Sequence, residues 1–382
     1  VWRTRRYSAY TGKGKPPLWT PLTEPQRLKE DSGTYFRDPN SAKFPTFPTE
    51  PAVRALFETD PNFATAEVDI FACGSTMGNL LRFVMSIYKP FRFNIDLVGS
   101  TLFLVRKEND PREVIKGVRG FGHTFPDAYT TWEKDVRGSE THQRLCRYEL
   151  GRFNCVLRFE CDGYLSQGQV QTFESSSSTE TCKGDGLLGS FSNFILGRDT
   201  VAKSDVITLK KGGSVVPQHT IFDLKTRSGQ YGRHIDMEDF YPQLWIRQIP
   251  NFIIAYHDGL GTFPTADIHV ENIEHRLQAW EKRNKVAVQR LIALLDKIIC
   301  ISQQHRGSLL EVYCPSVDRI EIRKQHGEGV HALPPELMAK WEALEEDAAL
   351  SNHENNSKLN QGELQLGLDS DDEPDYTACG DD

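Results

Sequence analysis

Two short segments place charged side chains where apolar runs end. Glu160 and Asp162 close one such run, and Asp223 and Lys225 lie within another. Side chains two residues apart on a strand share a face, so each pair is expected to project together. Side-by-side pairing of the two strands would gather three carboxylates and one ammonium group. The same spacing also fits two solvated strand faces with alternating charge.

Such a group of carboxylates suits a hard divalent cation. Mg²⁺ or Mn²⁺ takes oxygen ligands, and rigid strands leave coordination positions for water and a phosphate. We therefore expect Glu160, Asp162 and Asp223 to bind metal and Lys225 to orient or activate the attacking water. The chemistry that this pattern favours is the hydrolysis of a phosphodiester bond.

The elements that must position these residues read as strands and helices in mixed order. Apolar periodicity predicts a helix near residues 80–88, a hairpin over 91–98 and 101–105, and a buried strand over 252–256. A helical apolar face then continues over 273–298, with one gap near Asn284. The predicted fold class is α/β in the broad, α+β sense: a mixed β-sheet flanked by helices.

Composition divides the chain into three parts. Residues 1–65 are rich in Pro and basic residues and predict an extended arm, whereas 66–350 form one domain with a surface insertion near 166–218. Residues 351–382 hold nine acids and one Lys, which equals the whole formal charge of −8. This segment is expected to be a disordered acidic tail, and the neutral remainder is compatible with an anionic partner.

Several function classes find no support in the sequence. The eight cysteines form no C-x-x-C pair, which argues against structural zinc and favours reduced thiols. No run is apolar enough to span a membrane or to act as a signal peptide. The glycines match neither a P-loop nor a dinucleotide fingerprint. We expect an intracellular protein, nuclear or cytoplasmic, without membrane contact.

The E-x-D and D-x-K pairs resemble the PD-(D/E)XK nucleases, and their surroundings resemble the DXO-type decapping exoribonucleases. Three stretches carry the likeness: Leu150–Asp162, Ile221–Ser228 and the helix Leu244–Gln248. The likeness covers roughly residues 70–260. It implies that Gln248 is an active-site glutamine that helps position water or phosphate. It further implies a nucleic-acid partner, RNA, which is decapped or degraded from its 5′ end.

The sequence departs from this family in one motif. The family's G-x-x-F-E glutamate is replaced here, because Phe125 is followed by Pro126 and Asp127. Asp127 or Glu133 is a candidate substitute, and Asp223 stands where the family usually has glutamate. The alternative function is therefore a catalytically degenerate, nuclease-fold binding protein. Residues 245–256 and the long helix would then serve as the surface for a protein partner of unknown identity.

The chain also resembles fungal proteins labelled geranylgeranyl diphosphate synthetase, around residues 243–257, 273–299 and 375–379. Prenyl synthases are all-helical and use two facing aspartate-rich motifs. Here a single acidic string, 371–375, lies in the expected tail and contains Pro374, which interrupts helices. The strand-rich middle of the chain also conflicts with that class. A prenyl diphosphate synthase is therefore the third function considered.

Overall fold

The computed structural model describes residues 15–174, 207, 212–230 and 235–363. Its strands are β1 (Leu18–Trp19), β2 (Ile70–Cys73), β3 (Phe91–Val98), β4 (Thr101–Arg106), β5 (Thr130–Thr131), β6 (Gln143–Leu150), β7 (Phe153–Glu160), β8 (Gly163–Tyr164), β9 (Ile221–Ser228), β10 (Asn251–His257), β11 (Ile268–Asn272), β12 (Leu310–Ser316) and β13 (Arg319–Lys324). Its α-helices are α1 (Pro39–Lys43), α2 (Glu50–Thr59), α3 (Gly74–Val84), α4 (Thr124–Tyr129), α5 (Gln167–Glu174), α6 (Tyr241–Arg247), α7 (Glu274–Arg283), α8 (Lys285–Gln304) and α9 (Pro335–Glu363).

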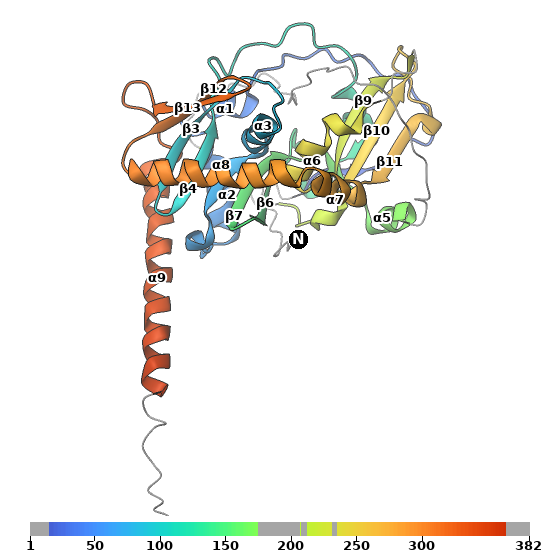
Figure 1. Cartoon of the computed structure of the whole chain (residues 1–382). Coiled ribbons are helices and arrows are strands. Elements are labelled where there is room, and N and C mark those ends of the chain that lie inside the picture. The colour runs from blue at the N-terminus through green and yellow to red at the C-terminus, as the bar shows by residue number, and fades with distance from the viewer. Residues whose placement is uncertain (1–14, 175–206, 208–211, 231–234, 364–382) are drawn as a thin grey trace, which may run out of the picture.

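The strands form two mixed sheets that lie next to each other (Figure 1). The seven-stranded sheet has the order β13-β12-β3-β4-β2-β7-β6, and the six-stranded sheet has the order β11-β10-β9-β8-β1-β5. Each combines parallel and antiparallel pairs, such as β2 with β7 and β6 with β7. The predicted class, a mixed α+β fold with flanking helices, is confirmed, although with two sheets instead of one.

Alternation along the strands divides the seven-stranded sheet between two cores. Ile70 and Ala72 of β2 face the core formed with α3, α6 and α8, whereas Phe71 faces a second core that includes α2 and the start of α9. Successive side chains of a strand point to opposite faces, so a sheet covered on both sides needs the continuous apolar runs seen in the sequence. Trp341 of α9 is fully buried in the second core.

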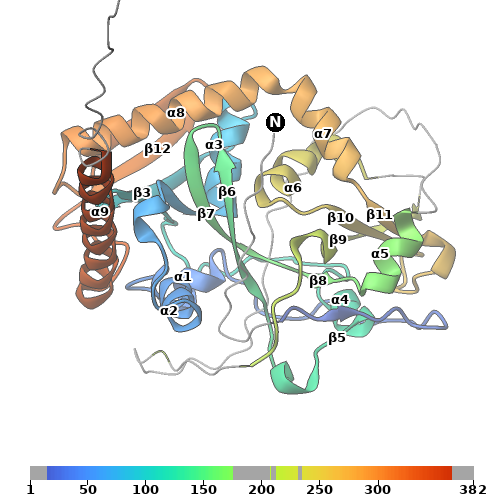
Figure 2. The same ribbon diagram turned by 90° about the horizontal axis from the view of Figure 1, so that it is seen from below.

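The helix predicted over 273–298 is divided into α7 and α8 at Asn284. At this break the Trp280 carbonyl accepts two hydrogen bonds from Asn284, one from the backbone N–H and one from side-chain Nδ2, both at 2.9 Å. The two helices run along one side of the molecule, with α8 beside β12 and β3 and α7 beside β10 and β11 (Figure 2). None of the described helices is long and apolar enough to cross a bilayer.

Two terminal segments differ from expectation where they are described. Within the predicted extended arm, α1 and α2 are helical, and Val53 and Leu56 of α2 are buried. A proline in the first turn suits α2, because that position has no intrahelical acceptor to lose. At the other end, α9 continues past residue 351 to Glu363 and projects from the body (Figure 1). Most of the 166–218 insertion and the whole acidic string at 371–375 lie outside the described residues.

The expected side-by-side pairing of the two charged strands is wrong. β7 belongs to the seven-stranded sheet and β9 to the six-stranded one. The strand that pairs with β9 on this side is the short strand β8, not β7. The chain crosses from one sheet to the other through Cys161 and Asp162. Gly163 allows this crossing, because a Cβ there would lie only 2.8 Å from the Pro17 carbonyl oxygen.

Candidate active site

The candidate site lies where the two sheets meet. β2, β4 and β7 run parallel, so their last residues, Cys73, Arg106 and Glu160, lie along one edge of the seven-stranded sheet. Helix α3 begins at this edge. Asp162 occupies the connection to β8, and Asp223 lies on β9. Ligands of α/β proteins commonly bind at the carboxyl ends of parallel strands, and the carboxylates gather there.

Asp223 is held between two cations. Its side chain is buried, and Lys225 Nζ lies 2.5 Å from Oδ1 while Arg247 Nη1 lies 3.2 Å from Oδ2. Lys225 also donates to the Leu224 carbonyl at 2.9 Å. Burial disfavours the charge of Lys225, but Asp223 and Asp162 raise its pKa, so it remains an ammonium. Both carboxylate oxygens of Asp223 therefore face a cation.

The other two carboxylates are less well compensated. Asp162 Oδ2 accepts a hydrogen bond from the Leu224 backbone N–H at 2.7 Å and lies 4.0 Å from Lys225 Nζ. Burial and the neighbouring Asp223 raise the pKa of Asp162 to about 6. Burial and Asp162 raise the pKa of Glu160 well above its usual value. The neighbouring carboxyl groups thus repel one another when they are charged, and such repulsion is common in functional sites.

The four residues predicted from strand spacing are brought together, whereas Gln248 takes a different place. It ends α6 with a left-handed backbone (φ 57°), and its Nε2 donates to the Trp245 carbonyl at 2.5 Å. Its own carbonyl accepts from Gln218 Nε2 at 2.7 Å. The neighbouring Arg247 contacts the cluster instead. An arginine within an otherwise buried apolar helix end is the sequence signal that would have found it.

The cluster forms part of the wall of a cavity of about 680 Å³. Asp127, the first of the two candidate substitutes for the family glutamate, also lines this cavity. Glu133 does not line it and instead contacts Lys15 Nζ and the Tyr164 hydroxyl, at 2.5 and 2.8 Å. Aromatic and cationic side chains complete the lining, among them Phe121, His123, Trp132, Arg227, Phe240 and His257. The cavity therefore offers ring faces and positive charge beside the carboxylates.

His142 is a further cavity residue that sequence analysis missed. It is 3% exposed, and neither ring nitrogen has a hydrogen-bond partner among the described residues. Burial and the charge of Arg144 lower its pKa to about 3, so the ring is neutral at physiological pH. A neutral imidazole offers one donor and one acceptor. No spacing pattern distinguishes this histidine from the other ten.

The donor types of the cluster suit a divalent metal better than their arrangement does. Carboxylate oxygens are the ligands that Mg²⁺ and Mn²⁺ prefer. Within the described part of the chain, however, no group of three or more His, Cys, Asp or Glu side chains is arranged to hold a metal ion. Both oxygens of Asp223 face cations. A metal would therefore require Lys225 or Arg247 to move.

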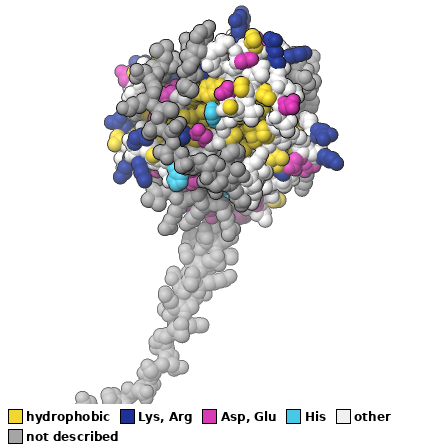
Figure 3. Space-filling view, turned by 90° about the vertical axis from the view of Figure 1, so that its right-hand side faces the viewer, with side chains coloured by type: hydrophobic (Ala, Val, Ile, Leu, Met, Phe, Trp, Pro, Cys, Tyr) yellow, Lys and Arg dark blue, Asp and Glu magenta, His cyan; other side chains and the backbone are white. Residues whose placement is uncertain are grey.

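On the face next to the six-stranded sheet, apolar side chains gather near the centre of the described surface, and Lys and Arg stand mainly at its edge (Figure 3).

A family model described as "Domain of unknown function (DUF8563)" matches residues 2–323. The chain belongs to this family. A comparison with curated proteins finds no match.

Rai1 and Dxo1 proteins are among the solved structures with some likeness to the chain. Rai1 of S. pombe in complex with 3′-FADP has a TM-score of 0.47 and 13% identity, covering 84% of this chain and 100% of that chain. Candida albicans Rai1 in complex with pU5-Mn²⁺ has a TM-score of 0.49 and 12% identity, with 89% and 100% covered. K. lactis Dxo1 in complex with manganese has a TM-score of 0.44 and 9% identity, with 86% and 100% covered. These distant likenesses do not define an activity for this chain.

Proposed function

We propose that the protein hydrolyses phosphodiester bonds in nucleic acid and that its substrate is the 5′ end of RNA. The observation that carries this proposal is the meeting of Glu160, Asp162 and Asp223 with Lys225 and Arg247 on one cavity wall. Carboxylates can activate water, and cations can balance the charge of a phosphoryl group. The choice of RNA and of its 5′ end rests on the resemblance of the three motifs to DXO-type enzymes.

In this proposal the chain's own residues divide the work. Glu160, whose pKa is raised, accepts a hydrogen bond from the attacking water and takes its proton. As the water oxygen bonds to phosphorus, the P–O bond to the leaving group breaks, and solvent water protonates the leaving oxygen. Arg247 turns from Asp223 toward a non-bridging phosphate oxygen, and Lys225 steadies the water or the phosphate. Mg²⁺ or Mn²⁺, held by Glu160, Asp162 and Asp223, would lower the pKa of a bound water. Gln248 retains its predicted role in positioning, which requires its side chain to leave Trp245.

The second candidate function is a degenerate binding protein with the same cavity. The pairing of both Asp223 oxygens with cations favours it, because such pairing stabilises the site without metal. The third candidate, a prenyl synthase, is disfavoured by the two sheets, since that class is all-helical. We also propose that the protein acts inside the cell, in the nucleus or the cytoplasm.

Degradation assays test the proposal. The full chain is incubated with 5′-monophosphate, 5′-triphosphate and capped RNA, with Mg²⁺, Mn²⁺ or EDTA. A Glu160→Gln, Asp162→Asn variant keeps the side-chain shapes but removes two ionisable carboxyl groups, and we expect a loss of about 10²- to 10³-fold in rate. The control variant, Glu328→Gln with Asp318→Asn, makes the same changes at exposed positions. If the wild type leaves every RNA and DNA substrate intact, the binding-protein alternative replaces the nuclease.

A further inference from the structure

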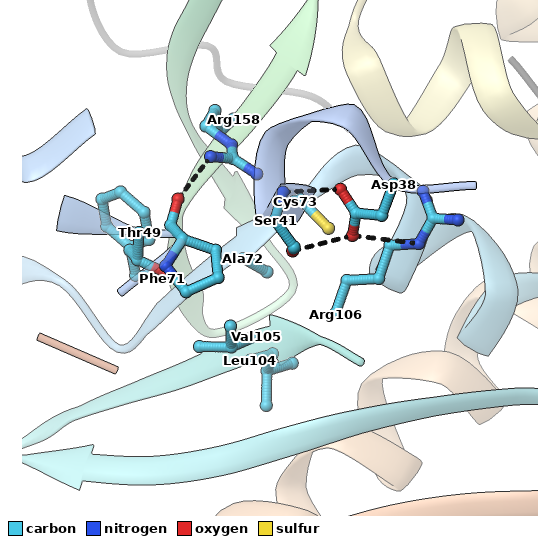
Figure 4. A pocket seen from close by; sticks show the side chains of 11 residues that line it. Asp38, Ser41, Thr49, Phe71, Ala72, Cys73, Leu104, Val105, Arg106 and Arg158 are labelled. Carbon is cyan, nitrogen blue, oxygen red and sulfur yellow. Dashed lines mark hydrogen bonds and ion pairs between the residues drawn. The ribbon is translucent and has the colours of Figure 1, made fainter. Parts of the chain in front are cut away.

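A group of basic residues lies along the same sheet edge as the carboxylates. Arg106 ends β4 and Arg158 lies two residues before the end of β7, on either side of Cys73 in β2 (Figure 4). Adjacent strands are about 4.8 Å apart, so the ends of β4 and β7 are separated by roughly 10 Å. A small cavity of about 20 Å³ lies between these two arginines. The edge of the sheet formed by the ends of β7, β2 and β4 therefore carries Glu160 and, next to it, the two arginines.

Two more cations extend this group away from the cluster. Arg82 belongs to the last turn of α3 and lies near Arg247, and Lys89 follows in the loop to β3. Burial and the charges of Arg82, Arg106 and Arg37 lower the pKa of Lys89 to about 8. The charges are thus close enough to disfavour one another. We call Arg82, Lys89, Arg106 and Arg158 the basic edge.

Among the residues that the structure describes, the basic edge finds only part of the negative charge that would neutralise it. Arg106 pairs with Glu108 at 2.6 Å and Asp38 at 3.6 Å. Arg82, Lys89 and Arg158, by contrast, form no ion pair with any residue that the structure describes, and the nearby charge of Glu108 only partly offsets that of the cations around Lys89. Arg158 donates to the Pro48 carbonyl at 2.8 Å, and Arg82 donates to Asn79 Oδ1 at 3.1 Å. Uncompensated like charges destabilise a fold, and a bound polyanion would remove that cost.

The residue beside Lys89 indicates which polyanion fits. Tyr88 is 56% exposed, and its hydroxyl donates to the Pro315 carbonyl at 3.0 Å, which fixes the ring at the surface. Single-stranded nucleic acids bind to surfaces that combine cations for phosphates with exposed aromatic rings on which bases stack. A duplex or an acidic peptide presents no free base face to such a ring.

We propose that the basic edge with Tyr88 binds the backbone of single-stranded nucleic acid and guides it to the carboxylate cluster. The inference deepens the proposed function, since the cluster is then the place where the bound strand is cut. Arg82, Lys89 and Arg158 supply phosphate contacts, and Tyr88 stacks on a base. Binding along this edge is independent of cleavage and can be measured without it.

The test measures binding of fluorescent single-stranded oligouridylate RNA to the full chain by anisotropy, in EDTA, over a range of NaCl concentrations. Each phosphate contact with a single strand contributes about 0.7 to the slope of log K against log salt. The Arg82→Gln, Lys89→Gln variant should lower the slope by about 1.4. Lys89→Gln alone should lower it by about 0.7, which keeps the test valid if the double variant folds poorly.

The control variant is Lys282→Gln with Arg290→Gln, which removes two exposed cations from α7 and α8. It should leave the slope unchanged. Equal slopes for the wild type and the Lys89→Gln variant would overturn the proposal, as would RNA affinity too weak to measure or equal affinity for an acidic peptide. Binding that depends on Lys89 in a protein that cuts no RNA would uphold the basic edge and refute the nuclease activity.

Discussion

Two groups of charged side chains in this protein, one around Glu311 and one at the candidate site, have opposite electrostatic character. Glu311 of β12 is 3% exposed and is surrounded by Arg92, Lys107 and Arg323, whose nitrogens lie 3.5, 2.9 and 2.7 Å from its oxygens. Burial opposes its charge, but hydrogen bonds from Lys107 and Arg323 lower its pKa. At the candidate site, by contrast, burial and neighbouring carboxylates raise the pKa of Glu160 and Asp162.

The comparison separates an ion-pair network that supports the fold from a group of charges that does not. One acid with three cations is satisfied, and it joins β12 to β3 and β13. Three acids with two cations leave charge repulsion in place, which a fold retains at a cost to stability. The pKa values of Glu160 and Asp162 thus shift in the opposite direction to that of Glu311 in the same molecule.

Removing one guanidinium from each cluster should give the largest contrast. Arg247→Gln takes away a partner of Asp223 at the cavity wall, and we expect RNA degradation to fall by about 10²- to 10³-fold. Arg323→Gln removes a partner of Glu311 and should change the rate less than twofold. Circular dichroism first verifies that both variants are folded, and initial rates of RNA degradation are then compared. Equal losses in the two variants would show that the clusters do not differ in function.

Neutralising one acid in each group should affect stability most at Glu311, the group where the arginine variant affects the rate least. Glu311→Gln leaves three cations without their carboxylate, which costs about 3–5 kcal/mol for a fully buried pair. Because Arg323 is 45% exposed, we expect about 1–3 kcal/mol in the free energy of unfolding. Glu160→Gln relieves repulsion and should leave stability equal or higher. Urea unfolding of both variants measures the difference, and a larger loss from Glu160→Gln would contradict the assignment.

The difference in stability between the wild type and Glu311→Gln has a predictable pH dependence. The pKa of Glu311 is lower in the folded state than in the unfolded chain, so its stabilisation is present above the unfolded value of about 4.3. As the pH falls below that value and through the folded pKa, the stabilisation is lost. The stability gap between the wild type and Glu311→Gln should therefore close on acidification from pH 6 to pH 3.

The smallest effect on the fold is expected at Gln248. Glycine tolerates its left-handed backbone, so Gln248→Gly should change the free energy of unfolding by no more than about 1 kcal/mol, despite the lost bond to Trp245. Its predicted role at the site requires slower degradation in a protein of normal stability. Unchanged degradation would assign Gln248 to ending α6 alone and leave Arg247 as the contribution of this helix.

Sequence reasoning identified the charged strand ends because period-two spacing is local. It also located the elements β3, β4 and β10, whose apolar runs are long enough to read. It missed the separation of β7 from β9, since a two-residue strand such as β8 leaves no periodic signal. Arg247 was missed although it stands out as a charged residue at an apolar helix end, because its partner Asp223 lies 24 residues away in the sequence. The resemblance pointed one residue further along, to Gln248.

The crossing between the sheets also constrains how the chain can change. Glu160 ends a strand of one sheet, Gly163 begins a strand of the other, and Asp162 is tied to the Leu224 N–H at 2.7 Å. Adding or deleting one residue between positions 160 and 163 would break this tie and rotate the carboxylates away from each other. Length variation can be absorbed in surface loops, but this connection has a fixed length wherever the carboxylate cluster is kept.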